Sequence, residues 1–207
     1  MSRDAPPLVL ASSSPRRRRV LEQLGIDFRV VPAPEGVETP WNGVESPPGF
    51  AERLARAKAA AVASSCPDAI VLAADTIVVL EGSVLEKPRD EAHACEMLTR
   101  LAGREHVVHT GAVVVAPQGT ASGLESTAVR FRALDAGQIE AYVATGEPLD
   151  KAGAYGIQGY GAALVESVRG CYFNVMGFPV SRVLGLLERV GWRYEFPGRL
   201  APVRARA

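Results

Sequence analysis

The sequence predicts an α/β protein, and three observations lead to this expectation. Residues 70–74 form an apolar run that is long enough for a strand buried on both faces and too short for an ordinary helix. Residues 8–11 form a second short apolar run, and a serine-rich break and a predicted helix follow it. The chain has 207 residues with 47% hydrophobic content. This size and composition allow one large core or two small lobes, so we expect a single compact unit.

Charge and composition restrict the classes of function. Lys and Arg number 23 and Asp and Glu also number 23, so we expect no general binding to nucleic acid or to a membrane surface, although a local basic pocket is compatible with this balance. The cysteines, Cys66, Cys95 and Cys171, lack metal-ligand spacing and are expected to be reduced. The sequence has no apolar run of transmembrane length and no signal-peptide pattern. We therefore expect a cytoplasmic protein.

The first helix is predicted to begin in a serine loop. Ser14 is a suitable N-cap and Pro15 suits the first helical position, so the helix should continue to about Leu24. Free backbone N–H groups at a helix start attract anions, and the loop hydroxyls, together with the arginines at 16–19, add donors there. Phosphate is the expected ligand. Arg16 is closest to the loop, whereas the arginines at 18 and 19 are expected to face solvent.

A strand is expected at residues 27–31, followed by a long loop at 32–48 that is rich in proline, glycine and acid. One of its acids, Glu35, Glu38 or Glu45, could reach a cation above the phosphates, although each could equally be solvated. The alanine-rich segment 50–65 predicts a helix. Its Lys58 lies on or beside the apolar stripe, so this side chain either extends to water or neutralises an anion in the site.

The segment 70–90 is predicted to organise the chain. The buried strand is expected to end at Asp75, and Glu81-Gly82 should form a two-residue hairpin turn. In that hairpin Thr76 would face Lys87, which makes Asp75 a neighbour of the same lysine. A carboxylate, a hydroxyl and an ammonium would then converge where the strand emerges. The alternative is a surface salt bridge at the base of a hairpin.

The second half of the chain continues the alternation of strands and helices. Asp135 should cap its helix, and the histidines are interpreted as structural. The four glycines of residues 147–161 allow close approach of a ligand to Gln158, whose amide suits a planar base edge. The expected elements are a helix at 90–101, a strand at 106–116, a turn at 119–123, a strand at 125–134, a helix at 135–144, a strand at 163–168, a turn at 174–177 and a helix at 179–190.

Four segments together resemble the signature blocks of one family. They are LASSSPRR at residues 10–17, AADTIV at 73–78, LEKPRD at 85–90 and EPLDKAGAYGIQG at 147–159. In order and spacing they are similar to the Maf family of nucleoside triphosphate pyrophosphatases, over about residues 8–192. The threonine after aspartate in AADT, together with Gln158, resembles the dTTP/UTP-hydrolysing branch rather than the 7-methyl-GTP branch.

This resemblance implies a fold and an activity. The fold would be a mixed twisted sheet flanked by helices, in two lobes around a nucleotide-binding cleft, as in Maf and ITPase-like proteins. Residues 1–7 would be an N-terminal extension, 8–196 a single catalytic domain and 197–207 a disordered basic tail. The activity would be cleavage of dTTP and UTP, or modified pyrimidine nucleotides, to the monophosphate and pyrophosphate. The resemblance also implies a homodimer.

The resemblance further implies roles for single residues. Asp75 would accept the proton of the attacking water. Substrate choice would involve Arg16, Thr76 and Gln158, and phosphates would be held by Lys58 and Lys87, with Ser12, Ser14 and Arg17 as further substrate-binding residues. A divalent Mg or Mn ion is expected with phosphate and hard oxygen ligands. Its ligands would be Asp75 and a loop acid, Glu35 or Glu38; we favour Glu38, which follows an aliphatic residue.

Two alternatives use the same pocket. One is the same reaction on 7-methyl-GTP or another purine nucleotide. The other is a nucleotide-binding regulator of septation that does not need hydrolysis. Asp75 beside a lysine favours the enzyme, because a regulator needs no acid to activate water.

Overall fold

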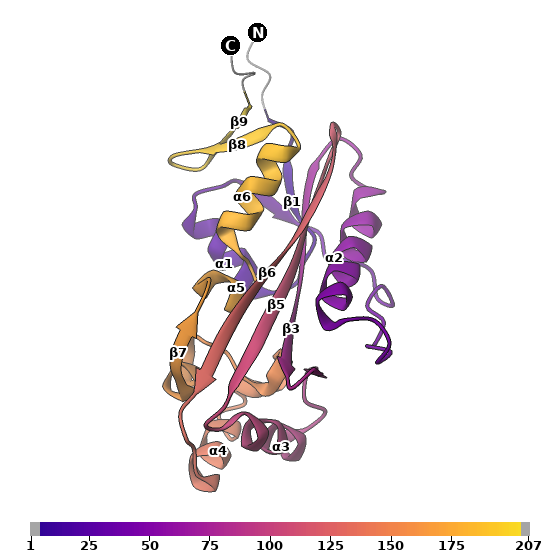
Figure 1. Ribbon diagram of the computed structural model, residues 1–207. Coiled ribbons are helices and arrows are strands. Elements are labelled where there is room, and N and C mark those ends of the chain that lie inside the picture. The colour runs from indigo at the N-terminus through magenta and orange to yellow at the C-terminus, as the bar shows by residue number, and fades with distance from the viewer. Residues whose placement is uncertain (1–4, 204–207) are drawn as a thin grey trace.

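The computed structural model describes residues 5–203, which form one large sheet, a small hairpin and the helices around them (Figure 1). The strands are β1 (Leu8–Leu10), β2 (Phe28–Val30), β3 (Ile70–Leu80), β4 (Ser83–Leu85), β5 (Glu105–Ala116), β6 (Gly119–Phe131), β7 (Val165–Arg169), β8 (Trp192–Glu195) and β9 (Arg199–Pro202). The α-helices are α1 (Pro15–Gln23), α2 (Pro47–Ala63), α3 (Glu91–Leu101), α4 (Ala136–Val143), α5 (Tyr172–Val175) and α6 (Val180–Arg189). Short 3₁₀ turns are η1 (Glu147–Asp150), η2 (Ala152–Ala154) and η3 (Gly159–Leu164).

The main sheet is mixed, with strand order β2-β1-β3-β5-β6-β7. β4 also pairs with β3, farther along the strand than β1 does. The strands β2, β1 and β3 run parallel, whereas β4, β5, β6 and β7 are added antiparallel. The parallel strands are joined through helical crossovers. Of the antiparallel pairs, β3–β4 and β5–β6 are joined by two-residue turns, whereas α3 lies between β4 and β5, and α4 lies between β6 and β7. The predicted α/β class with a mixed sheet is confirmed.

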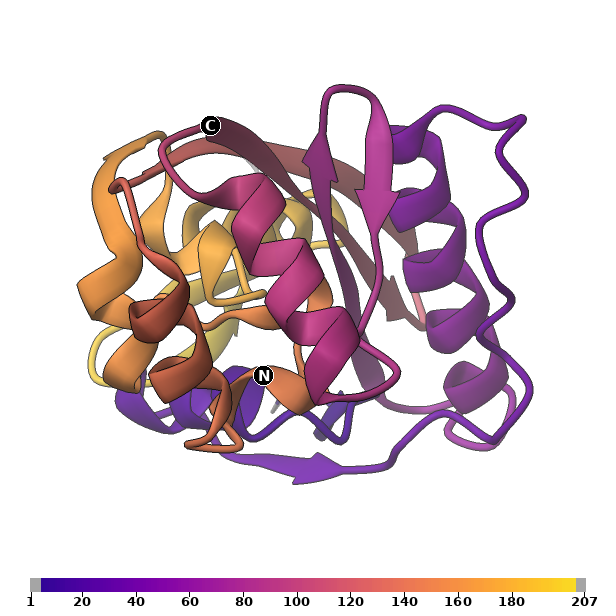
Figure 2. The same cartoon turned by 90° about the horizontal axis from the view of Figure 1, so that it is seen from below.

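Helices cover both faces of this sheet. In Figure 1 the long strands β3, β5 and β6 run through the middle of the molecule, with α2 against one face and α6 against the other. Seen from below, α3 and α4 lie side by side under the end of the sheet (Figure 2). One buried cluster centres on β1, α1 and α6, and a second on α3, α4 and the far halves of the long strands.

The edge of β3 is interrupted, and this interruption positions the site. β1 pairs with β3 only at residues 70–72, and β4 pairs with it only at residues 78–80. Within residues 5–203 no strand pairs with that edge at residues 73–77. Asp75 and Thr76 lie in this gap, and because side chains alternate along a strand they point to opposite faces of the sheet. One strand can therefore supply two different groups to a single opening.

Several expectations about β3 and β4 need correction. β3 does not end at Asp75 but continues through it to Leu80, because the carboxylate finds a partner on α2 and can remain buried. The hairpin register Leu80↔Ser83 is as predicted. Pairing stops at Val78↔Leu85, however, so Thr76 does not face Lys87 across the hairpin.

Further differences concern turns and the C-terminal segment. The turn predicted at residues 119–123 is wrong: these residues belong to β6, and the chain reverses at 117–118. The turn expected at 174–177 overlaps the short helix α5. In the segment expected to be a disordered tail, β9 pairs with β8. Residues 1–4 and 204–207 lie outside the described part of the chain.

The helices lie close to the expected residue ranges, although α2 begins at Pro47, within the segment expected to be a loop. Asp90 and Asp135 accept hydrogen bonds from the N–H groups of His93 and Gln138, and Gln138 completes a capping box. Ser14 takes the N-cap position of α1, but its side chain makes no capping hydrogen bond. Among the described residues, no helix combines the length and apolar character needed to span a bilayer.

Candidate active site

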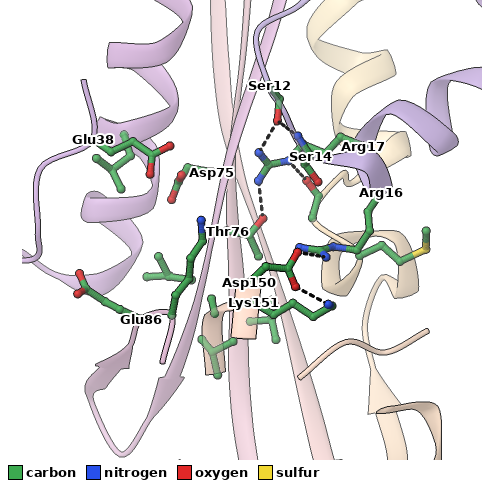
Figure 3. Close-up of a pocket in the computed structure, with 18 of the residues that line it drawn as sticks. Ser12, Ser14, Arg16, Arg17, Glu38, Asp75, Thr76, Glu86, Asp150 and Lys151 are labelled. Carbon is green, nitrogen blue, oxygen red and sulfur yellow. Dashed lines mark hydrogen bonds and ion pairs between the residues drawn. The ribbon is translucent and has the colours of Figure 1, made fainter. Parts of the chain in front are cut away.

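A cavity of about 600 Å³ opens beside the interrupted edge of β3. Its wall includes the serine loop before α1, part of the loop after β2, the face of α2, the end of β4 and the glycine-rich segment after α4. Figure 3 shows Glu38 and Asp75 on one side of this space and Ser12, Arg16 and Arg17 on the other. Carboxylates and cations from five separate segments thus face a common volume, which suits a concave ligand site.

Lys58 joins two carboxylates on the α2 side. Its Nζ lies 2.5 Å from Asp75 Oδ1 and 2.7 Å from Glu38 Oε1. The Lys58 and Asp75 side chains are only 8% and 10% exposed, whereas Glu38 is 60% exposed. The lysine therefore does not extend to bulk water. Of the two interpretations of Lys58, the structure supports the one in which it neutralises an anion.

Burial and charge act on these two carboxyl groups in different proportions. Burial raises the pKa of Asp75 above its ordinary value, and the positive charges of Lys58 and Arg17 offset only part of this effect. Burial also acts on Glu38, but the hydrogen bond and charge of Lys58, with the charges of Lys87 and Arg17, hold the pKa of Glu38 below its ordinary value. Asp75 is therefore the better proton acceptor of the pair.

Asp75 has one oxygen available for that role. Lys58 donates to Oδ1, and within residues 5–203 no hydrogen bond reaches Oδ2. No ion pair or hydrogen bond joins Asp75 to Lys87 in this part of the chain either, so the predicted contact between them is replaced by the contact with Lys58. Lys87 is exposed, lines the cavity and acts on Glu38 through its charge.

Arg17 is buried on the opposite side of β3 and fixes the serine loop. It donates to Ser12 Oγ at 3.0 Å, to Thr76 Oγ1 at 3.1 Å and to Gly177 O at 2.8 Å. Ser12 also accepts from the Ser14 N–H at 3.2 Å. Burial lowers the pKa of Arg17 from its ordinary value, and the charge of Asp75 opposes this effect. Arg17 and Ser12 thus line the cavity while holding its wall in place.

Arg16 lies at the other end of the same wall. It pairs with Asp150 at 3.5 Å, and Asp150 Oδ1 also accepts from Lys151 Nζ at 2.5 Å (Figure 3). Arg16 is partly exposed, with 28% of its side chain accessible, so it can meet an anion in the cavity. As expected, the arginines at 18 and 19 are exposed.

Gln158 lines the cavity from the glycine-rich segment. It is half-buried, and within residues 5–203 its amide makes no hydrogen bond. The amide is therefore available to a ligand. Ser14 and Thr76 also line the cavity, and Thr76 Oγ1 lies 3.0 Å from Thr110 Oγ1.

The cavity is lined by all the residues assigned to the site and by three further charged residues that sequence reasoning left out. Of the two candidate loop acids, Glu38 contacts Lys58 and lines the cavity. The additional wall residues are Asp150, Lys151 and Glu86, whose Oε1 accepts from the Trp41 N–H at 3.3 Å. Asp150 and Lys151 lie within the glycine-rich segment 147–161, and their place in that segment could have identified them as cavity residues.

The fold and the site define a class: an α/β protein whose sheet edge carries a buried carboxylate facing a cavity lined by lysine, arginine and serine. Such a cavity suits a phosphorylated ligand, since cations and hydroxyls meet the phosphate oxygens and the carboxylate is free to take a proton. The chain belongs to the Maf family, because the family model described as Maf-like protein matches residues 7–190.

Two relatives of about 50% sequence identity agree with this assignment. A protein of Moorella thermoacetica named dTTP/UTP pyrophosphatase is 54% identical over 186 residues, which cover 89% of this chain and 95% of that protein. A protein of the same name from Symbiobacterium thermophilum is 52% identical, with 89% and 94% covered. Among solved structures, the Ham1 protein of Staphylococcus aureus aligns with a TM-score of 0.45 and 16% identity over 77% of this chain and 79% of that chain.

Proposed function

We propose that this protein hydrolyses UTP and dTTP to the monophosphate and pyrophosphate. The observation that carries the proposal is the buried Asp75, which has a raised pKa and one oxygen free of hydrogen bonds within residues 5–203, at the edge of a cavity with cations on both sides. The similar proteins named dTTP/UTP pyrophosphatase support the choice of substrate.

In the proposed reaction Asp75 takes a proton from water as the water oxygen attacks the α-phosphorus. The bond between that phosphorus and the oxygen bridging to the β-phosphate breaks, and pyrophosphate leaves with that oxygen. The phosphoryl oxygens gain charge, which Arg16, Lys58 and Lys87 would balance. Lys58 also fixes the Asp75 carboxylate through its 2.5 Å contact, so the second oxygen keeps a defined direction.

Base recognition is assigned to Gln158. Uracil and thymine present an acceptor, a donor and an acceptor along one edge, which an amide can partly match. A site that pairs such groups rejects a base that leaves them unpaired. The side chain lines the cavity and carries no hydrogen bond from the rest of residues 5–203, which supports this role.

A divalent Mg or Mn ion fits this donor set when the substrate completes its coordination. Magnesium is usually held by one or two carboxylates together with phosphate oxygens and water. Glu38 and Asp75 already share one cation, the Lys58 ammonium. Within residues 5–203 no cluster of three acidic, histidine or cysteine side chains would bind a metal alone. We propose Glu38 and Asp75 as its ligands; the ion would neutralise charge on the phosphates.

The test measures pyrophosphate release from UTP, dTTP, CTP, GTP and 7-methyl-GTP with magnesium or manganese. We expect release from UTP and dTTP, and a loss of at least ~100-fold in Asp75→Asn, as for removal of a general base. Asp68→Asn, at an exposed position before β3, is the matched control and should keep full activity. Preference for 7-methyl-GTP would instead assign the protein to the branch of the family that hydrolyses 7-methyl-GTP. Nucleotide binding without any pyrophosphate release would refute the proposed enzymatic activity and favour a nucleotide-binding regulator of septation.

Three further proposals concern the protein as a whole. We propose a cytoplasmic location, where the pool of nucleoside triphosphates is found, and no nucleic-acid partner, in keeping with the balanced charge. We also propose a homodimer, which light scattering after size-exclusion chromatography would test against a monomer mass of 22.0 kDa.

A further inference from the structure

We infer that Glu147 is a positioning residue: its carboxylate holds the loop that carries Gln158 and thereby determines the selectivity for the base. Glu147 begins η1 and is not among the residues that line the cavity. It must therefore act through other groups. The inference rests on the proposed function for its selectivity readout, while its structural part can be tested separately.

The Glu147 carboxylate accepts hydrogen bonds from one side of the loop directly. The Tyr160 N–H donates to Oε2 at 2.9 Å, and the Gly161 N–H donates to Oε1 at 3.0 Å. The Tyr142 hydroxyl also donates to Oε1, at 2.8 Å, and accepts from the Gly156 N–H at 3.3 Å. One carboxylate thus holds residues 156–161 at both ends, and Gln158 lies between them.

The glycines of this loop have no room for a side chain. Gly159 has φ +68°, and a Cβ there would lie 2.5 Å from Glu147 Oε2. A Cβ on Gly161 would lie 2.1 Å from the Gly156 carbonyl oxygen and 2.7 Å from the Tyr142 hydroxyl. At Gly161 any other residue would require a shift of the backbone, and at Gly159 a side chain would displace the Glu147 carboxylate and strain the positive φ. The loop is therefore folded around the carboxylate at close contact, rather than merely near it.

Glu147 also connects the loop to the cavity wall. Its backbone carbonyl accepts from Lys151 Nζ at 2.5 Å, and the same ammonium contacts Asp150, the partner of Arg16. The loop, the wall and the first turn of α1 are thus linked through a short series of polar contacts. Movement of Glu147 would change the placement of Gln158 relative to the phosphate-facing residues.

The held loop fixes the backbone on both sides of Gln158 and so limits the positions that the Gln158 amide can reach. A freely moving amide can turn to suit either uracil or cytosine, whereas an amide on a held loop meets one pattern better than the other. Loss of the carboxylate should therefore reduce discrimination between bases more than it reduces the chemical step. Within residues 5–203 neither Asp75 nor Lys58 contacts Glu147, which does not line the cavity.

The experiment compares kcat/KM for UTP and CTP in four proteins: wild type, Glu147→Gln, Gln158→Ala and the double variant. Glu147→Gln preserves shape but replaces one acceptor oxygen by a donor, so it cannot accept from all three N–H and O–H groups. We expect the UTP:CTP ratio to fall about tenfold in Glu147→Gln, through a higher KM for UTP. The double variant should discriminate no worse than Gln158→Ala alone, because Glu147 acts through Gln158. The matched control is Glu166→Gln on β7, which breaks an exposed ion pair with Arg130 of β6 and should leave the ratio unchanged.

Hydrogen exchange of the amides at residues 156–161 supplies a readout that needs no activity. Faster exchange in Glu147→Gln, with the rest of the protein unchanged, supports the holding role, and unchanged exchange overturns it. Equal loss of activity on UTP and CTP, or additive effects in the double variant, would refute the selectivity role. If the wild type released no pyrophosphate from UTP, the proposed function and the selectivity claim would fail together, while the exchange result would still decide whether Glu147 holds the loop.

Discussion

At Asp75 two effects of opposite sign act on one carboxyl group, because burial raises its pKa while the charge of Lys58 lowers it. An aspartate with a raised pKa in the folded protein binds a proton there more tightly than in the unfolded chain. Its contribution to stability therefore declines as the pH rises above its unfolded pKa of about 4. Lys58 limits this decline, because its ammonium compensates the buried charge.

Removal of the ammonium should expose this linkage. In Lys58→Met we expect the free energy of unfolding at pH 8 to fall by about 3 kcal/mol, since an unpaired buried charge remains. At pH 5 the loss should be smaller, because Asp75 then takes a proton more readily and the charge disappears. Urea denaturation at both pH values measures the difference. In an Asp75→Asn background the same substitution should show little pH dependence; an equal loss at both pH values in the original background would contradict the argument.

At the scale of elements, the approach of α2 to the sheet places Lys58 at Asp75. Gly111 of β5 lies directly opposite Asp75 in the strand register. A Cβ on Gly111 would lie 2.6 Å from the backbone carbonyl oxygen of Ala51 in α2. Since the contact is with backbone, the helix itself would have to move. The missing side chain thus sets the distance between helix and sheet at the site.

Gly111→Ala should therefore affect both stability and activity. We expect a loss of about 1–3 kcal/mol in the free energy of unfolding, as for other overpacked contacts, and weaker hydrolysis of UTP because α2 carries Lys58 away from Asp75. Gly185→Ala is the matched control: Gly185 lies inside α6, and its Cβ would meet nothing within 4 Å. That substitution should raise stability by up to about 1 kcal/mol, from helix propensity. Unchanged activity and stability in Gly111→Ala would show that α2 adapts without consequence.

At the scale of the whole molecule, local sequence patterns predicted most of the helices and strands, whereas contacts between segments distant in sequence could not be predicted from such patterns. The serine loop, the cap at Asp135 and the hairpin turn depend on neighbours in sequence, so their patterns were sufficient. The continuation of β3 through Asp75 depends on Lys58 of α2. A strand-breaking charge becomes acceptable only when the fold supplies its partner.

The same distinction applies to the site and to the C-terminal segment. Motifs identified candidates such as Asp75, but the pairing of Arg16 with Asp150 joins residues far apart in the chain, and no local pattern predicts it. β9 was missed because its basic composition resembles a tail. The hairpin it forms with β8 packs against the end of α1, where the Tyr194 hydroxyl donates to the Leu24 carbonyl at 2.8 Å. Tertiary contact, rather than propensity, orders that segment.

The pH dependence of global stability should depend strongly on His106. This histidine of β5 is buried among aromatic rings, with Nε2 2.8 Å from the Tyr155 hydroxyl, and burial lowers its pKa from 6.5 to about 4. Between these values the unfolded chain binds more protons than the folded protein, so stability is lost as the pH falls from about 6.5 through about 4. The loss should reach about 3 kcal/mol, at about 1.4 kcal/mol per pKa unit. His106→Gln keeps a polar group near Tyr155 but cannot titrate, so the difference between wild type and variant in urea denaturation isolates this residue from Asp75 and Glu38. A difference that stays constant from pH 7 to pH 4 would mean that His106 does not titrate differently in the folded and unfolded states.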